Sequence, residues 1–159
     1  MRPRRGPKPV PRTEADIWDL LADVPDPEIP VISVTDLGIV RSVRLDGRQV
    51  RVAITPTYSG CPATSVIGIA IEAALRGAGL EPVIDTQIDP PWTTDWLTDE
   101  AREKLRAYGI APPSAKGPKA CPRCGSPDLS RVSQHGSTPC KAQWRCQSCL
   151  EPFDYFKCI

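Results

Sequence analysis

The sequence of 159 residues contains little histidine and no long apolar segment. Its one histidine, His135, lies near the C-terminal end, so residues 1–134 offer no imidazole and a cysteine–histidine nucleophile pair there is not supported. No apolar run approaches the ~20 residues of a membrane-spanning helix. The sequence also has no Glu-x-x-His pair for a di-iron centre, no dinucleotide-binding glycine fingerprint and no ferredoxin-type cysteine spacing.

The first twelve residues, MRPRRGPKPVPR, are basic and rich in proline, with no apolar stretch. A secretory signal needs such a stretch, and prolines oppose an amphipathic targeting helix, so we expect residues 1–12 to be a flexible basic tail. We expect the protein to be cytoplasmic. Its seven cysteines would then stay reduced and serve metal binding or chemistry rather than disulfides.

Charge is unevenly distributed along the chain. Residues 1–12 carry five basic and no acidic side chains, residues 13–113 carry eight basic and sixteen acidic, and residues 114–159 carry seven basic and three acidic. Phosphate contacts dominate nucleic-acid affinity, so the acidic central part argues against nucleic acid along it, although an ordinary solvated surface explains the pattern as well. A nucleic-acid-binding C-terminal part is a minor alternative, based on its charge and on Trp144, Phe153, Tyr155 and Phe156.

The periodicity of apolar residues predicts an α+β domain over residues 13–110, in the order α-β-β-α-β-α. The expected elements are a helix over 13–24, a hairpin over 37–55, a helix over 62–78, a strand over 82–88 and a helix over 98–109. Thr13 and Thr98 are the expected N-caps and Gly109 the residue after the last helix. The expected apolar face of the second helix consists of Val66, Ile69, Ala70, Ala73 and Ala74.

A composition rich in proline and small residues predicts a linker over residues 111–120, followed by a zinc ribbon over residues 121–159. The ribbon carries two Cys-x-x-Cys turns separated by 21 residues. The four predicted zinc ligands are Cys121, Cys124, Cys146 and Cys149. Four thiolates complete a tetrahedral structural zinc site, whose metal would stabilise a module too small for a large core. An iron site or a cluster is the alternative.

Three other residues of the ribbon have no clear assignment. Cys140 and Cys158 exceed what one zinc requires, and they could be packing residues, transient ligands or a redox pair. A packing role is slightly favoured. His135 lies in the QHGSTPC stretch between the two cysteine pairs, where an exposed loop residue is more typical than a ligand.

Cys61 stands apart from the other cysteines, in the stretch TPTYSGCPAT. Pro62 suits the first turn of a helix, which places Cys61 near the N-cap, where free N–H groups and the helix dipole favour a thiolate. Gly60 permits a sharp bend before it. The neighbouring hydroxyl-bearing residues are Thr55, Thr57, Tyr58, Ser59 and Thr64. A packing cysteine, a metal or cluster ligand and a nucleophile all remain open.

Acidic residues precede this stretch in PDPEIPVISVTDLGIV, which contains Asp26, Glu28 and Asp36. Carboxylates in such a segment commonly end helices and stabilise turns. The alternative is that Asp36 or Glu28 approaches the Cys61 thiolate and completes a labile metal site. The sequence does not decide between the two.

The segment DPEIPVISVTDLGIV, followed by TPTYSGCPAT, resembles iron–sulfur cluster assembly factors of the metal–sulfur cluster biosynthesis family. The resemblance implies a small α+β domain in which Cys61 is the functionally essential residue. It also implies that the acidic D-P-E and D-L-G segments of the family correspond to Asp26–Glu28 and to Asp36–Gly38.

The segments DPPWTTDWLTDEAREKLRAYGIAPP and HGSTPCKAQWRCQSCLEPFDYFKCI are similar to the small accessory subunits of bacterial phenylacetyl-CoA epoxidase systems, over about residues 17–159. This resemblance implies a role in aerobic phenylacetate degradation. In those systems a multicomponent di-iron monooxygenase forms the ring 1,2-epoxide, and an iron–sulfur flavoprotein reductase supplies the electrons.

These resemblances together imply a maturation subunit without catalytic residues of its own. Cys61, with Asp36 or Glu28, would transiently hold iron or an iron–sulfur cluster for the oxygenase or its reductase, and zinc in the ribbon would be structural. The alternative is a zinc-stapled scaffold that stabilises the oxygenase complex. We expect no nucleic-acid or membrane partner, and exposed strand edges leave a homodimer open.

Overall fold

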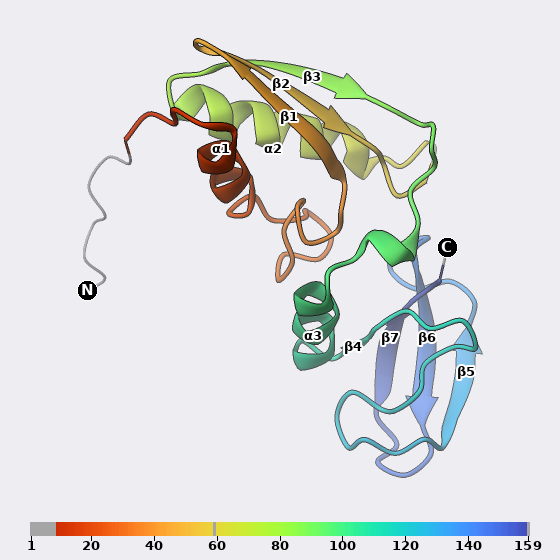
Figure 1. Ribbon diagram of the computed structural model, residues 1–159. Helices are drawn as coiled ribbons and strands as arrows, with labels where there is room; N and C mark the ends of the chain where they lie inside the picture. Colours follow the sequence, from red (N-terminus) through yellow and green to blue (C-terminus); the bar gives the residue numbers. More distant parts are fainter. Residues whose placement is uncertain (1–8, 59, 159) are drawn as a thin grey trace.

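The computed structural model describes residues 9–58 and 60–158 of the chain. The elements of its first part are α1 (Glu14–Leu21), β1 (Val40–Asp46), β2 (Gln49–Ile54), α2 (Ala63–Gly77), β3 (Glu81–Thr86), the 3-10 turn η1 (Thr94–Trp96) and α3 (Asp99–Ala107). β2 is the central strand, antiparallel to β1 and parallel to β3. Figure 1 shows α1 and α2 on one side of this sheet. The predicted α+β order and the hairpin are confirmed.

The helix ends form where local side chains satisfy free backbone groups. The Asp16 N–H donates to Thr13 Oγ1 at 3.1 Å and the Thr13 N–H donates back to Asp16 Oδ2 at 3.0 Å, which makes a capping box at the start of α1. Thr98 Oγ1 accepts the Ala101 N–H at 3.0 Å at the start of α3. Gly109 follows this helix with φ of 90°, the left-handed geometry that favours glycine. Both predicted N-caps are therefore confirmed.

The predicted apolar face of α2 is only partly right, because Ala70 and Ala74 pack against the core but the larger predicted side chains do not. Val66 and Ile69 are 49% and 67% exposed, whereas Ile67, Ile71 and Leu75 are buried. The buried stripe recurs every four residues and carries the larger aliphatic side chains. Turning this stripe toward the sheet removes more apolar area from water than burying the alanine-rich face would.

The C-terminal part is a second sheet, in the order β4-β7-β6-β5. Its strands are β4 (Ile110–Ala111), β5 (Leu129–Ser133), β6 (Lys141–Cys146) and β7 (Pro152–Phe156). β4 pairs in parallel with β7, so the segment predicted as a linker begins inside this sheet. The Ser114 N–H donates to Tyr155 Oη at 3.2 Å, and the Tyr155 hydroxyl donates to the Ser114 carbonyl at 2.8 Å. This part of residues 111–120 is therefore not a free tether.

The two sheets meet through a shared hydrophobic core. Cys140 and Phe156 of the C-terminal part are buried in the same apolar cluster as α1, α2 and α3. The ring of Phe156 lies 6.2 Å from that of Trp92, and the Trp92 indole N–H donates to the Leu37 carbonyl at 2.8 Å. Figure 1 shows η1 and α3 beside this junction. The ribbon therefore packs against the segment that precedes β1.

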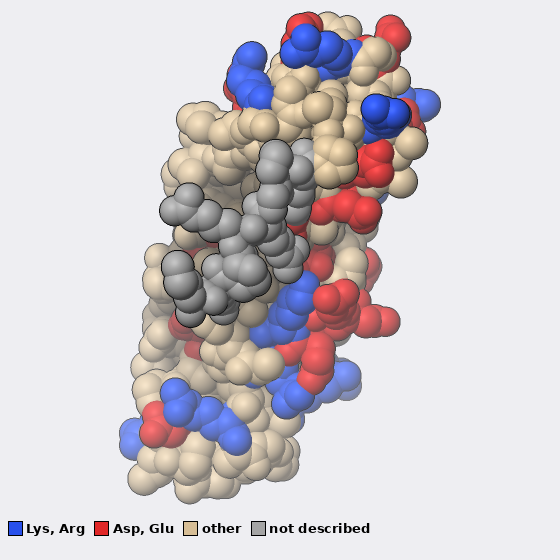
Figure 2. Space-filling view, turned by 90° about the vertical axis from the view of Figure 1, so that its left-hand side faces the viewer, with Lys and Arg blue, Asp and Glu red and all other residues tan. Residues whose placement is uncertain are grey.

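The C-terminal aromatic residues mainly build cores. Phe153 and Tyr155 are buried in a second cluster with the cysteine turns, while Phe156 belongs to the shared core. A nucleic-acid-binding surface stacks bases on exposed aromatic rings. These three rings are buried, so they do not provide such a surface. On the face shown in Figure 2, acidic and basic side chains are interspersed rather than gathered by sign.

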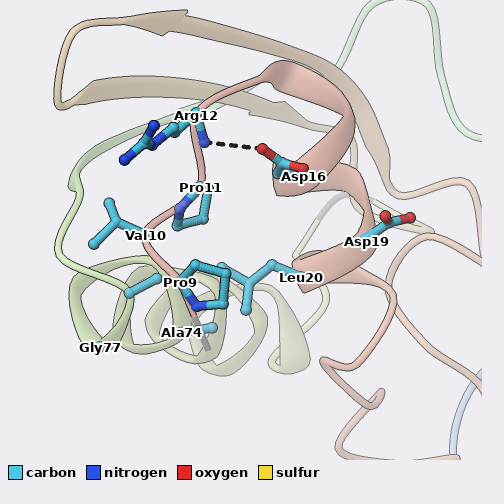
Figure 3. A pocket seen from close by; sticks show the side chains of 10 residues that line it. Pro9, Val10, Pro11, Arg12, Asp16, Asp19, Leu20, Ala74 and Gly77 are labelled. Carbon is cyan, nitrogen blue, oxygen red and sulfur yellow. Dashed lines mark hydrogen bonds between the residues drawn. The ribbon is translucent and has the colours of Figure 1, made fainter. Parts of the chain in front are cut away.

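Residues 9–12 run beside α1 and the C-terminal end of α2 (Figure 3). They border a hollow of about 720 Å³, which Val10 and Leu20 help to line. The Arg12 N–H donates to Asp16 at 2.9 Å, which fastens this segment to α1. The rest of the predicted basic tail, residues 1–8, lies outside the described residues.

Within the described part of the chain, no helix combines the length and the apolar character that crossing a bilayer requires.

Candidate functional site

Cys61 lies in the loop between β2 and α2, half-buried, one residue before the N-cap of α2, which is Pro62. Gly60 makes the predicted bend with φ of 80°. The Cys61 N–H donates to the Tyr58 carbonyl at 3.3 Å, and the Cys61 carbonyl accepts the Thr64 N–H at 3.1 Å. These backbone bonds hold the thiol at the start of the helix. Ser59, a predicted source of a hydroxyl, lies outside the described residues.

A small cavity of about 20 Å³ lies on one side of Cys61. Four of its lining residues carry ligand-type side chains: Asp26, Glu28, Cys61 and Cys140. The structure thus brings Glu28 to the cysteine, as one of the sequence alternatives proposed, and adds a second thiol from the ribbon. The role of Glu28 as a ligand stays a prediction.

An open groove lies on the other side of Cys61, between α2 and β3. It has a volume of about 500 Å³ and is lined by Cys61, Thr64, Gly68, Ile69 and Ile84, among others. Cys61 therefore lines both a small, partly enclosed cavity and an open groove at the surface. A species bound to its sulfur could be reached from outside without unfolding of the loop.

The loop that carries Glu28 is fixed by Asp26. Its Oδ1 atom accepts the backbone N–H groups of Glu28 at 2.8 Å and Ile29 at 2.7 Å. Burial raises the pKa of Asp26, and burial together with the Asp26 charge raises the pKa of Glu28. Asp26 is thus mainly a positioning residue, because its carboxylate accepts two backbone N–H groups of the turn. The described residues donate no such hydrogen bond to the Glu28 carboxylate.

Asp36 lies elsewhere. Its Oδ2 atom accepts the Ser33 N–H at 3.0 Å and the Lys104 ammonium at 2.9 Å, and it borders a different hollow, together with Pro25 and Lys104. It is not among the residues that line the Cys61 cavity. The contacts of Asp36 are those of a structural carboxylate, which stabilises its turn and links it to α3, so its role as a metal ligand finds no support in the geometry.

Cys140 is held at the cavity by the loop between β5 and β6. Its Sγ lies 3.0 Å from Thr138 Oγ1, and its carbonyl accepts the Lys157 N–H at 2.9 Å. Burial is the main reason why the pKa of the Cys140 thiol is raised. The next residue, Lys141, is buried, with Nζ 3.9 Å from Asp154. Its ammonium partly offsets the charges of Asp26, Glu28 and Cys140.

The Tyr58 hydroxyl is buried and has no hydrogen-bond partner in normal geometry among the described residues. Burial, followed by the proximity of Cys61, raises the pKa of this phenol to about 12. The charges of Glu28 and Cys140 act in the same direction. The hydroxyl is therefore a neutral donor within electrostatic range of three ligand-type groups.

A second cluster lies in the ribbon, where the sulfur atoms of Cys121, Cys124, Cys146 and Cys149 are all within 4.8 Å of one another. Two of the edges, Cys121–Cys149 and Cys124–Cys146, measure 3.8 Å and 3.5 Å. Metal–sulfur bonds of about 2.3 Å in a tetrahedron give sulfur–sulfur edges of about 3.8 Å. The cluster is thus a metal-binding arrangement, and among the described residues no other group of three or more such side chains converges in this way.

The two cysteine turns have the same local geometry. Gly125 and Leu150 each follow the second cysteine of a pair, with φ of 78° and 64°. The Cys149 N–H points at Cys146 Sγ, with its nitrogen 3.5 Å away, and lowers the pKa of the Cys146 thiol to about 6. A thiolate, which is the form that binds metal, is therefore favoured at Cys146.

The two remaining predictions concern Cys158 and His135. Cys158 is exposed, with Sγ 3.3 Å from Thr94 Oγ1, and takes no part in either cluster. His135 is an exposed loop residue, as predicted. Sequence reasoning missed the position of Cys140 and the buried Lys141. The sequence offered one indication of Cys140 and Lys141. They are adjacent in the stretch HGSTPCK, which lies in a segment that carries the family resemblance.

Two family models match the chain. Residues 14–89 match the iron–sulfur cluster assembly protein family, and residues 111–157 match the PaaD zinc beta ribbon domain. The first match contains Cys61, Asp26 and Glu28. The second contains the four clustered cysteines and also Cys140, so the ligand-type residues of the cavity come from both matched regions.

The chain is also similar to proteins that carry functional names. It is 53% identical, over 91% of its length and 92% of the relative, to a protein of Escherichia coli K12 named as a putative subunit of 1,2-phenylacetyl-CoA epoxidase. It is 37% identical, over 59% of its length and 91% of the relative, to "Fe-S protein maturation auxiliary factor" of Porphyromonas gingivalis. The crystal structure of a DUF59 domain from Bacillus anthracis matches 58% of the chain and 90% of that domain, with a TM-score of 0.54 and 25% identity.

Proposed function

Because the chain belongs to the PaaD family of 1,2-phenylacetyl-CoA epoxidase subunits, we propose that it is a maturation factor for that enzyme system. Its task would be to hold iron or an iron–sulfur cluster transiently and to deliver it to the oxygenase or to the iron–sulfur reductase. Cys61 is the proposed carrier ligand. The clients are the partner proteins that this role requires.

The observation that carries the proposal is the position of Cys61 between a cavity and a groove. The cavity supplies Glu28 and a second thiol, while the groove leaves Cys61 open to a partner. A storage site would enclose its metal, and a packing cysteine would not need carboxylates beside it. A ligand that must both bind and release its cargo needs donors on one side and access on the other.

We assign a different role to the ribbon cluster, which would hold one zinc ion as a structural metal. Four thiolates on two short turns form a closed tetrahedral site, and structural zinc sites are of this kind. The second core of the ribbon is small, so metal binding would contribute much of its folding free energy. The zinc would thereby also keep Cys140 in place at the cavity.

Metal analysis of anaerobically purified protein tests both roles. We expect about one zinc per chain in wild type and in Cys61→Ser, but iron only in wild type. The matched control is Cys158→Ser. Cys158 is exposed and belongs to neither metal site, so this variant should keep both metals. Loss of zinc in Cys61→Ser would show that the two sites were wrongly separated.

A growth assay tests the link to the epoxidase. In a bacterial strain that lacks its own PaaD-family protein, wild type and Cys158→Ser should restore growth on phenylacetate as sole carbon source, and Cys61→Ser should not. Full growth with a folded Cys61→Ser protein would refute the carrier role. The result would instead favour a scaffold that stabilises the oxygenase complex without binding cargo.

A further inference from the structure

The ribbon contributes a thiol to the Cys61 site, although this thiol is distant in sequence and belongs to another matched family region. Cys140 is 5% exposed and lines the same cavity as Cys61. It does not belong to the four-cysteine cluster in its own module. The site is therefore made by two parts of the chain together.

Three features of the surroundings suit a bound cation rather than simple packing. Cys61 and Cys140 offer two soft donors, and Glu28 offers a carboxylate beside them. The buried Tyr58 hydroxyl lies beside Cys61 but has no hydrogen-bond partner in normal geometry among the described residues. A buried donor without an acceptor is costly, and a metal-bound thiolate or carboxylate would satisfy it.

The size of the cavity limits what it holds. A volume of about 20 Å³ has room for about one water molecule, and hence for one ion rather than a multi-atom cluster. Two thiolates with a carboxylate favour a borderline or soft divalent cation such as Fe²⁺ over Mg²⁺ or Ca²⁺.

We propose that a single divalent metal ion draws Cys61 and Cys140 together, with Glu28 turning in as a third ligand, so that the ribbon completes the carrier site. In the structure the three side chains line one cavity but do not converge as the ribbon cysteines do. This inference rests on the proposed function, because it specifies the cargo of that site. Both thiols lose their protons to solvent as the two metal–sulfur bonds form, which leaves the overall charge balanced. The oxidation state of the metal does not change.

The ribbon would thereby couple two metals. The zinc cluster orders β6 and the turn before β7, and Cys140 directly precedes β6. The Gly136 N–H donates to the Lys141 carbonyl at 2.8 Å, which closes the loop that presents Cys140. A Cβ on Gly136 would lie 3.2 Å from Lys141 Cβ, so this approach favours glycine. Cys140 is therefore delivered by a folded ribbon.

Fe²⁺ binding to the full-length, zinc-loaded protein under anaerobic conditions tests the proposal. We expect wild type and Cys158→Ser to bind about one Fe²⁺ in addition to zinc. Cys61→Ser and Cys140→Ser should each bind it at least roughly 100-fold more weakly. Zinc content and thermal unfolding report whether each variant is folded. Wild-type Fe²⁺ affinity in Cys140→Ser would overturn the inference.

The outcomes separate this inference from the proposed function. If Cys61→Ser alone loses Fe²⁺, Cys61 remains a carrier ligand and the role of Cys140 is refuted. If wild type takes up a cluster but no single Fe²⁺, the single-ion site is refuted while the growth assay still judges the carrier role. A wild-type protein that binds neither refutes both.

Discussion

Replacement of Gly38 by alanine should destabilise the junction between the two parts of the protein. Gly38 follows the cavity-lining residue Leu37 and has φ of 68°. A Cβ at this position would lie 2.6 Å from the Trp96 carbonyl oxygen and 2.8 Å from Trp96 Cβ. Trp96 cannot easily move away, because its backbone belongs to η1 and its ring packs 3.5 Å beneath the Arg41 guanidinium.

Two costs add at Gly38. The left-handed backbone disfavours alanine by about 1–2 kcal/mol. The forced contact with a backbone carbonyl adds roughly 1–3 kcal/mol, as in other overpacked sites. We therefore expect Gly38→Ala to lower the free energy of unfolding by roughly 2–5 kcal/mol and the thermal midpoint by about 10 °C for a chain of this size.

Gly47→Ala is the matched control. Gly47 has a similar φ of 60°, but a Cβ there would meet nothing within 4 Å. Gly47→Ala should therefore lower the free energy of unfolding only by the backbone cost, about 1–2 kcal/mol. Guanidinium unfolding of zinc-loaded wild type and both variants, followed by circular dichroism, measures the difference. Equal destabilisation of the two variants would refute the close approach of Gly38 to Trp96.

Two further predictions concern the ion pairs of Lys104, with Asp36 at 2.9 Å and Glu100 at 3.1 Å, and a single backbone angle. The hydrogen bond that Lys104 donates to Asp36, followed by its bond to Glu100, raises the pKa of Lys104. These ion pairs should therefore stabilise the fold below about pH 10.5 and lose that effect as pH rises through the folded-state pKa. In urea unfolding, Lys104→Met should cost about 1 kcal/mol at pH 7 but less at pH 11, and a pH-independent cost would contradict the ion-pair explanation. Leu150, which has φ of 64°, is exposed and corresponds to Gly125, so Leu150→Gly should raise the stability of the ribbon by about 0.5–1 kcal/mol. Leu150→Ala should not raise it, and equal thermal midpoints for the two variants would argue against strain at this residue.

Local features of the fold followed from the sequence because neighbouring residues decide them. Thr13 caps α1 and Thr98 caps α3 through bonds that span three residues. The two residues Gly47 and Arg48 form the turn that joins β1 to β2, again through local geometry. The two Cys-x-x-Cys turns each aim their thiols together locally, and only their meeting required the sheet.

Orientation was harder to predict, because it depends on what an element packs against. Both faces of α2 carry apolar residues, and the buried one was decided by the fit of Ile67 and Ile71 against the sheet. Asp36 and Glu28 were equal candidates for the cysteine site. The fold gave Asp36 a partner in Lys104 on α3 and gave Glu28 a place at the cavity.

The sequence by itself determined the order of helices and strands, the pairing of cysteines within each turn and the family resemblance, because these depend on residue types at short spacing. Only the tertiary structure decided that Cys140 lines the same cavity as Cys61, since this arrangement requires the ribbon to pack Phe156 against Trp92 and share the core of the first part. Contacts of that kind arise from hydrophobic burial between distant segments, which leaves no periodic or spacing signal in a single chain.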